Sequence, residues 1–221
     1  EQLIRPRAAN VALANAKGAY CLFLDEDDWI EPDHIATLVQ TIADNPDAQV
    51  AYSGVQNASS NGEPLSTVVS VPFNADRLKR DNYIPIHAVL FSASLIAAGC
   101  RFDETLDIYE DWDFWLQCAQ HSRFVHLDKV SAWYRLGGSS DTLVTDEKVR
   151  YQKGHPIALA REKVLEKWRT RWTGADLNRL IGAMDQSALI RTLNEELAVT
   201  HQTVNTRDQA LEAARGVLTE Q

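Results

Sequence analysis

The chain has 221 residues, 45% of them hydrophobic, and a formal net charge of −9. The length fits one domain with an appendage, and the acidic balance argues against the phosphate backbone of a nucleic acid as partner. The three cysteines match no zinc-ligand spacing and lie in apolar stretches, so we interpret them as reduced core thiols of a cytoplasmic protein. No signal peptide is visible, and the longest mostly apolar stretch, 88–100, is too short to span a bilayer.

Helices and strands are predicted to alternate over the first half of the chain. An alanine-rich helix at 11–16 ends near Gly18, and an apolar strand follows at 19–24. Pro32 opens a helix with an apolar face at helical spacing, made of Ile35, Leu38, Val39 and Ile42. The further elements expected here are strands at 49–55, 68–73 and 86–91, a short polar helix at 75–81, and a helix that begins at Ser92 or Ser94 and ends at Gly99.

The second half is predicted to complete the α/β part and then to become wholly helical. The elements expected first are a helix at 111–120 and short strands at 124–127 and 131–135. A segment from Gly137 to about His155 begins with glycines and serines and is interpreted as flexible. Glycine and proline then become scarce, so we predict an α/β domain at 1–155 and a helical extension at 156–221.

Two features of the helical extension leave alternatives open. Apolar residues recur every seven positions at Leu197, Val204, Leu211 and Leu218, with a weak second seam at Thr200, Arg207 and Ala214. A coiled coil that joins copies of the chain and an amphipathic helix packed on its own domain fit this pattern equally well. Basic residues and Trp168 at 163–171 favour an ordinary solvated helix face, with peripheral contact to a membrane surface as the alternative.

Four consecutive acidic residues, Asp25-Glu26-Asp27-Asp28, directly follow the apolar strand expected at 19–24. Four like charges repel one another, and a divalent cation relieves that repulsion well. Carboxylate oxygens suit Mg²⁺ or Mn²⁺, and Mg²⁺ commonly takes one or two protein carboxylates together with substrate phosphates. The cluster therefore indicates a metal and diphosphate site, with a solvated acidic turn as the alternative.

A second group of acids, Glu110, Asp111 and Asp113, lies at the start of the helix expected at 111–120. Helix capping explains one or two acids at such a position. Capping explains less well why Trp112, Phe114 and Trp115 lie beside these acids. Aromatic side chains can desolvate a carboxylate and raise its pKa toward that of a general base. One carboxylate site for a metal and another for a proton suggest group transfer from a nucleotide diphosphate.

Three segments resemble family 2 glycosyltransferases of the GT-A fold in their order and spacing. The first runs from Asn10 through Asn15-Ala16-Lys17-Gly18 and the acidic cluster to Pro32-Asp33, the second comprises Gly99 to Glu104 and Glu110 to Leu116, and the third is Trp133-Tyr134-Arg135. The resemblance implies a GT-A, Rossmann-like mixed sheet flanked by helices. Relatives begin with a nucleotide-base pocket whose counterpart is not recognised here, so we expect a fold that is incomplete at its N-terminus.

The resemblance also implies residue roles. Asp27 would hold Mn²⁺ or Mg²⁺, Asp25 would assist the metal and lie nearer the nucleotide ribose, and Asp28 would help through water. Arg135 would contribute to nucleotide binding. Asp111 matches the catalytic base, with Glu110 as the fallback candidate. In many relatives a histidine follows the aromatic-Arg pair, and glycines occupy that region here. His155 lies further on, and we interpret it as a solvated loop residue more readily than as a substitute for that histidine.

The leading hypothesis is an inverting, metal-dependent glycosyltransferase that moves a sugar from a UDP-, GDP- or dTDP-sugar to a hydroxyl acceptor such as a glycan. Surface polysaccharide or glycan synthesis, in the cytoplasm or at the inner face of the membrane, is an expectation from the resemblance. The alternative is a non-catalytic GT-A-like module that assembles through its helical tail. Among the other histidines, we place His34 on an exposed helix side and keep His87 as a weak site candidate.

Overall fold

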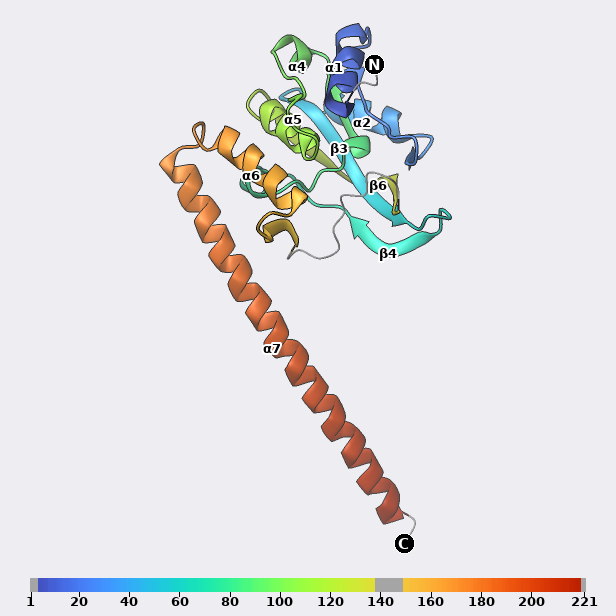
Figure 1. Ribbon diagram of the computed structural model, residues 1–221. Helices are drawn as coiled ribbons and strands as arrows, with labels where there is room; N and C mark the ends of the chain where they lie inside the picture. The colour runs from blue at the N-terminus through green and yellow to red at the C-terminus, as the bar shows by residue number, and fades with distance from the viewer. Residues whose placement is uncertain (1–3, 138–148, 220–221) are drawn as a thin grey trace. The chain divides into compact units, whose positions relative to one another are not determined.

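The structure is a computed structural model and describes residues 4–137 and 149–219. Its contacts divide it into two compact units, Glu1–Arg171 and Trp172–Gln221. The first unit holds a six-stranded sheet with helices around it, and the second holds one long helix (Figure 1). The boundary expected at residue 155 thus differs from the division of contacts after Arg171, because the intervening helix packs in the first unit.

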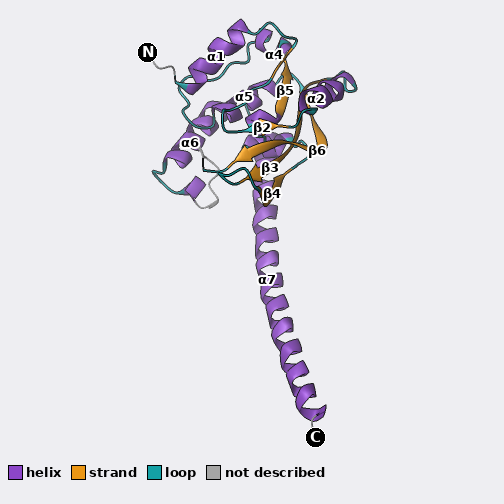
Figure 2. Ribbon diagram, turned by 90° about the vertical axis from the view of Figure 1, so that its right-hand side faces the viewer, coloured by secondary structure: helices purple, strands orange, loops and turns teal. Residues whose placement is uncertain are grey.

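The sheet is mixed, because β3 runs parallel to β6 and antiparallel to β4 and β5. The strands are β1 (Tyr20–Cys21), β2 (Trp29–Ile30), β3 (Ala48–Ala58), β4 (Pro64–Val69), β5 (Val89–Ser92) and β6 (Arg123–Arg135). Their order is β1-β5-β3-β6-β2, with β4 paired to β3 outside that path. Figure 2 shows the strands in orange. The predicted α/β class with a mixed sheet is confirmed. The two short strands expected at 124–127 and 131–135 form one strand, β6.

The α-helices are α1 (Arg5–Asn15), α2 (His34–Ala43), α3 (Ala75–Arg80), α4 (Ser94–Ala97), α5 (Glu110–Cys118), α6 (Pro156–Trp168) and α7 (Gly174–Thr219), with 3₁₀ turns at Ile86–Ala88 and Val149–Tyr151. They confirm the helices predicted near 75–81 and 111–120. The first helix begins earlier than expected, and the strand expected at 86–91 starts only after a 3₁₀ turn.

Alternation along β3 separates two layers of core, because neighbouring strand residues point to opposite faces. Ala51 belongs to a cluster with Leu38 and Ile42 of α2. Val50 is paired with Phe91, whose ring meets Phe114 of α5 edge-on at 5.3 Å between centroids. Helices α2 and α5 thus cover opposite faces of β3.

The prediction that His34 lies on the exposed side of α2 is wrong. His34 is fully buried, whereas Ile35 is 48% exposed. The His34 ring nitrogen Nδ1 lies 2.8 Å from the Ser131 hydroxyl of β6. Burial of a polar ring requires such a partner, and this one is remote in sequence.

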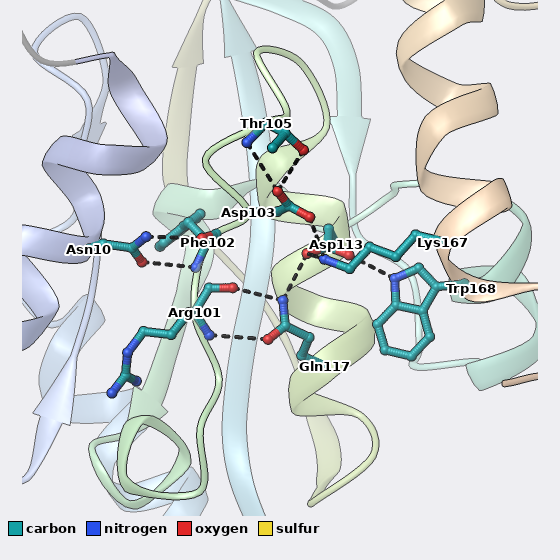
Figure 3. Close-up of polar contacts among 9 residues, drawn as sticks. All are labelled: Asn10, Arg101, Phe102, Asp103, Thr105, Asp113, Gln117, Lys167 and Trp168. Carbon is teal, nitrogen blue, oxygen red and sulfur yellow. Dashed lines mark hydrogen bonds and ion pairs between the residues drawn. The ribbon is translucent and has the colours of Figure 1, made fainter. Parts of the chain in front are cut away.

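Within the first unit, a buried carboxylate of α5 holds α6 in place (Figure 3). Asp113 is fully buried; its Oδ1 accepts from Trp168 Nε1 at 2.7 Å, and its Oδ2 accepts from Lys167 at 2.8 Å and from Gln117 at 2.7 Å. Lys167 also contacts Asp103 at 2.7 Å. The interpretation of 163–171 as a solvated face is therefore wrong for Lys167 and Trp168, which point into the protein.

Helix α7 forms the second unit by itself. Apolar side chains along it are largely exposed, including Ile190 (58%), Leu193 (52%), Leu197 (52%) and Val204 (48%). Leu211 and Leu218, the last two positions of the expected heptad, have side chains outside the described part of the chain. Among residues 4–137 and 149–219, no helix is both long and apolar enough to cross a lipid bilayer.

Candidate active site

The acidic cluster forms the loop between β1 and β2. A turn closes it, in which the backbone N–H of Asp28 donates to the Asp25 carbonyl at 3.2 Å. Arg135 of β6 fastens the same loop, since its Nε donates to the Asp27 carbonyl at 2.9 Å and its guanidinium lies over the Trp29 ring. The Arg135 side chain thus supports the loop backbone, and its predicted contact with a nucleotide stays a prediction.

Asp28 points inward and forms a buried pair with His87. Its Oδ1 accepts from the Arg135 backbone N–H at 3.0 Å, and its Oδ2 lies 3.0 Å from His87 Nδ1. Burial raises the pKa of Asp28 to about 6 and lowers the pKa of His87 to about 4. At neutral pH the pair is therefore an ionised carboxylate beside a neutral imidazole. The weak candidate His87 is in this way brought to the acidic loop.

Helix α5 begins directly after a strained residue. Tyr109 has φ 65° and ψ 21°, a left-handed conformation that residues with bulky side chains seldom adopt. Its ring packs edge-on against Trp112 at 5.5 Å between centroids. Strain of this kind persists where the surroundings enforce it and clusters at functional sites. The first turn that follows presents Glu110 and Asp111.

The two carboxyl groups of this turn occupy environments that oppose ionisation. Burial, followed by the neighbouring charge of Asp111, raises the pKa of Glu110 to about 7. Burial also raises the pKa of Asp111, against hydrogen bonds to its carboxylate from Asn82 Nδ2 and the Trp112 N–H, both at 2.8 Å. A carboxyl group with a pKa near the working pH suits proton transfer.

Arg5, at the start of α1, joins the two acidic groups. Its Nη2 lies 2.6 Å from Asp25 Oδ2, and its Nε lies 3.3 Å from Glu110 Oε1. Burial opposes the charge of Arg5, but Glu110, Asp25 and Asp111 outweigh burial and raise its pKa. The structure therefore brings the two sequence motifs to one site, although about eighty residues separate them in the chain.

The carboxylates of Asp25 and Asp27 are the candidate metal ligands in this loop. The Asp27 side chain is half-buried and has no hydrogen-bond or ion-pair partner among the described residues. In the described part of the chain, no group of three or more His, Cys, Asp and Glu side chains is arranged to hold a metal. Two carboxylates still fit Mg²⁺, which keeps water and phosphate oxygens as its other ligands.

His155 is not part of this arrangement. Its Nδ1 accepts from the Ile157 N–H at 3.3 Å, so it caps the start of α6. Sequence reasoning missed Arg5, Asn82 and the pairing of His87 with Asp28. Each contact spans twenty or more residues, and no local pattern of residue types announces it.

Comparisons with known proteins find similarity to glycosyltransferases. The family model "Glycosyl transferase family 2" matches residues 5–97. An uncharacterized glycosyltransferase of Methanocaldococcus jannaschii is 24% identical over 67% of this chain and 52% of its own length. A hyaluronan synthase of Pasteurella multocida is 26% identical over 71% of this chain and 16% of its own length. The chain thus spans about half of the length of the first of these relatives and much less of the length of the second.

Among solved structures, TarS 1–349 of S. aureus in complex with UDP-GlcNAc superposes with a TM-score of 0.46 and 21% identity. The match covers 59% of this chain and 38% of TarS 1–349. The family match itself covers α1, the acidic loop and the strands β1 to β5, and so includes Arg5, Asp25 and Asp27. Residues 5–97 of this chain thus match glycosyl transferase family 2.

Proposed function

We propose that the protein is an inverting, metal-dependent glycosyltransferase that moves a sugar from a nucleotide-diphosphate donor to a hydroxyl acceptor. The single observation that supports this best is the meeting of the acidic loop and the first turn of α5 at Arg5. Two acidic groups with different surroundings lie within reach of one guanidinium. One group can serve the donor diphosphate, and the other can accept a proton.

In this proposal Asp111 is the catalytic base, and Glu110 is the fallback candidate. The raised pKa of each carboxyl makes it a stronger base once ionised, so it can take the proton of the acceptor hydroxyl as that oxygen attacks the sugar. Asn82 holds the Asp111 carboxylate in place through its amide. Direct displacement by the activated hydroxyl inverts the configuration of the sugar carbon.

Asp25 and Asp27 would hold Mn²⁺ or Mg²⁺ beside the donor diphosphate. When bound, such a cation supplies positive charge that stabilises the departing diphosphate. The protein's own part is to fix the loop: Arg135 binds the Asp27 carbonyl, and Asp28 is anchored to β6 and to His87. Relatives named as hyaluronan and chondroitin synthases support a glycan acceptor and a role in polysaccharide synthesis. A cytoplasmic or inner-membrane-surface location stays a prediction.

The donor site is tested by thermal unfolding with UDP, GDP and dTDP, each with and without Mn²⁺. We expect one nucleotide to raise the melting temperature in a Mn²⁺-dependent way, because a ligand that binds only the folded state stabilises it. A saturating ligand at about a hundred times its dissociation constant stabilises by about 2.7 kcal/mol, which is a shift of several degrees.

The matched variants are Asp27→Ala and Glu26→Ala, which remove the same charge from the same loop. Glu26 is exposed and is not a proposed ligand. The shift should disappear in Asp27→Ala and survive in Glu26→Ala. Equal shifts in wild type and Asp27→Ala would contradict the assignment of this carboxylate. Loss in both variants would instead indicate a general charge effect.

The alternative is a non-catalytic module that assembles through its tail, and the exposed apolar side chains of α7 favour it. A helix with half-exposed Ile190, Leu193 and Leu197 on one stripe gains stability when a second copy covers that stripe. We expect sedimentation of the full chain to show a dimer or higher oligomer, and deletion of 190–221 to give a monomer. An unchanged number of chains in the sedimenting species after deletion would exclude assembly through the tail.

A further inference from the structure

Arg5 lies between the acidic loop and the first turn of α5 and contacts both. It uses two different nitrogens, Nη2 for Asp25 and Nε for Glu110, so one guanidinium neutralises one carboxylate of each motif. The forked geometry of the guanidinium suits this double contact, which a lysine could not reproduce. Arg5 also precedes both motifs in the chain and belongs to neither.

The surroundings of Arg5 are strongly acidic. The negative charges of Glu110, Asp25 and Asp111 act on Arg5. The positive charge of Arg5 in turn favours the ionised form of Asp28. The nearby Arg135 does not share this task, because its side chain is turned to the carbonyls of Asp27 and Ser60. Like charges that gather at one site need a counter-ion, and Arg5 supplies it in the described structure.

The two partners of Arg5 differ in their freedom to move. The side chain of Arg5 is 46% exposed and that of Asp25 is 35% exposed, whereas Glu110 is 6% exposed. Pro6, the next residue of α1, is buried and fixes the helix end. The Arg5 side chain can therefore rotate away from Asp25 into solvent without moving α1, while Glu110 stays in place.

We propose that Arg5 is an internal counter-ion that holds Asp25 while no divalent cation is bound and competes with that cation for the carboxylate. The inference rests on the proposed metal role of Asp25 and Asp27. A cation at Asp25 repels the guanidinium, so binding of the metal requires the contact at 2.6 Å to open. Arg5 then lowers the affinity of the protein for the cation. In the metal-free protein it keeps the acidic loop ordered.

A purely structural clasp between α1 and α5 would behave differently. Removal of a clasp would lower the stability of the fold and leave metal affinity unchanged. Removal of a competitor strengthens metal binding even if stability falls. The sign of the change in metal affinity thus separates the two explanations.

The test is Mn²⁺ binding to the full chain without nucleotide, followed through the electron paramagnetic resonance signal of free Mn²⁺. Arg5→Gln should bind Mn²⁺ about two- to fivefold more tightly than wild type, which corresponds to the strength of a partly exposed ion pair. Arg7→Gln is the matched control, because Arg7 is an exposed arginine on the same helix. It removes the same charge and should leave the affinity nearly unchanged, since salt screens distant charges. Arg5→Lys should lie between Arg5→Gln and wild type.

A second readout follows the Arg5 side chain itself. The Nε–H resonance of Arg5, assigned by its loss in Arg5→Gln, should shift when Mg²⁺ is added to wild type. Equal or weaker Mn²⁺ binding in Arg5→Gln would overturn the inference and leave the proposed function standing. If neither wild type nor Arg5→Gln binds Mn²⁺, the inference and the metal assignment both fail.

Discussion

Asp113→Ala is expected to lower the free energy of unfolding by about 3–5 kcal/mol, the usual cost of removing one partner of a buried ion pair. The carboxylate accepts hydrogen bonds from Lys167, Trp168 and Gln117, and the change leaves the indole N–H of Trp168 buried without its acceptor. Because two of these donors belong to α6, we expect this helix to detach first. Urea unfolding followed by tryptophan fluorescence measures the loss.

The control for Asp113→Ala is Glu166→Ala on the same helix. Glu166 pairs with Arg169, and both side chains are more than 60% exposed, so its loss should cost less than about 1 kcal/mol. Limited proteolysis should cut α6 readily in Asp113→Ala and slowly in Glu166→Ala. Unfolding midpoints that agree between Asp113→Ala and wild type would contradict the anchoring role.

Asp111→Asn is expected to lower kcat for sugar transfer by about 10²–10⁴-fold, the range that a positioned general base contributes. The amide keeps the size of the side chain and can still bond Asn82, but it cannot take a proton from the acceptor. Nucleotide binding should stay close to that of wild type, because Asp111 lies on α5 and the proposed donor carboxylates lie in the loop before β2. The measurement uses the sugar nucleotide that matches the thermal-shift result.

Glu110→Gln tests the fallback base in the same assay. If Asp111 is the base, Glu110→Gln should retain more activity than Asp111→Asn, although it also removes a contact of Arg5. The reverse order would assign the proton transfer to Glu110. Full transfer activity in both variants would exclude a base in the first turn of α5.

Similar acids in the second motif have different roles, and only the structure separates them. Sequence reasoning grouped Glu110, Asp111 and Asp113 as candidates at one helix start. Successive residues of a helix project about 100° apart, so acids two positions apart face different sides. Asp111 and Asp113 are two positions apart: Asp113 points toward α6 and bonds Trp168, whereas Asp111 faces Asn82.

The sequence by itself determined the α/β class, the acidic loop after β1, the acidic start of α5 and the helical tail. These features are local, because they depend on residue order and on periods of two and 3.6 residues. The tertiary structure alone decided that Arg5 joins Asp25 to Glu110, that His87 faces Asp28 and that Ser131 lets His34 be buried. Each of these contacts joins residues at least twenty positions apart, and packing of whole elements sets such distances.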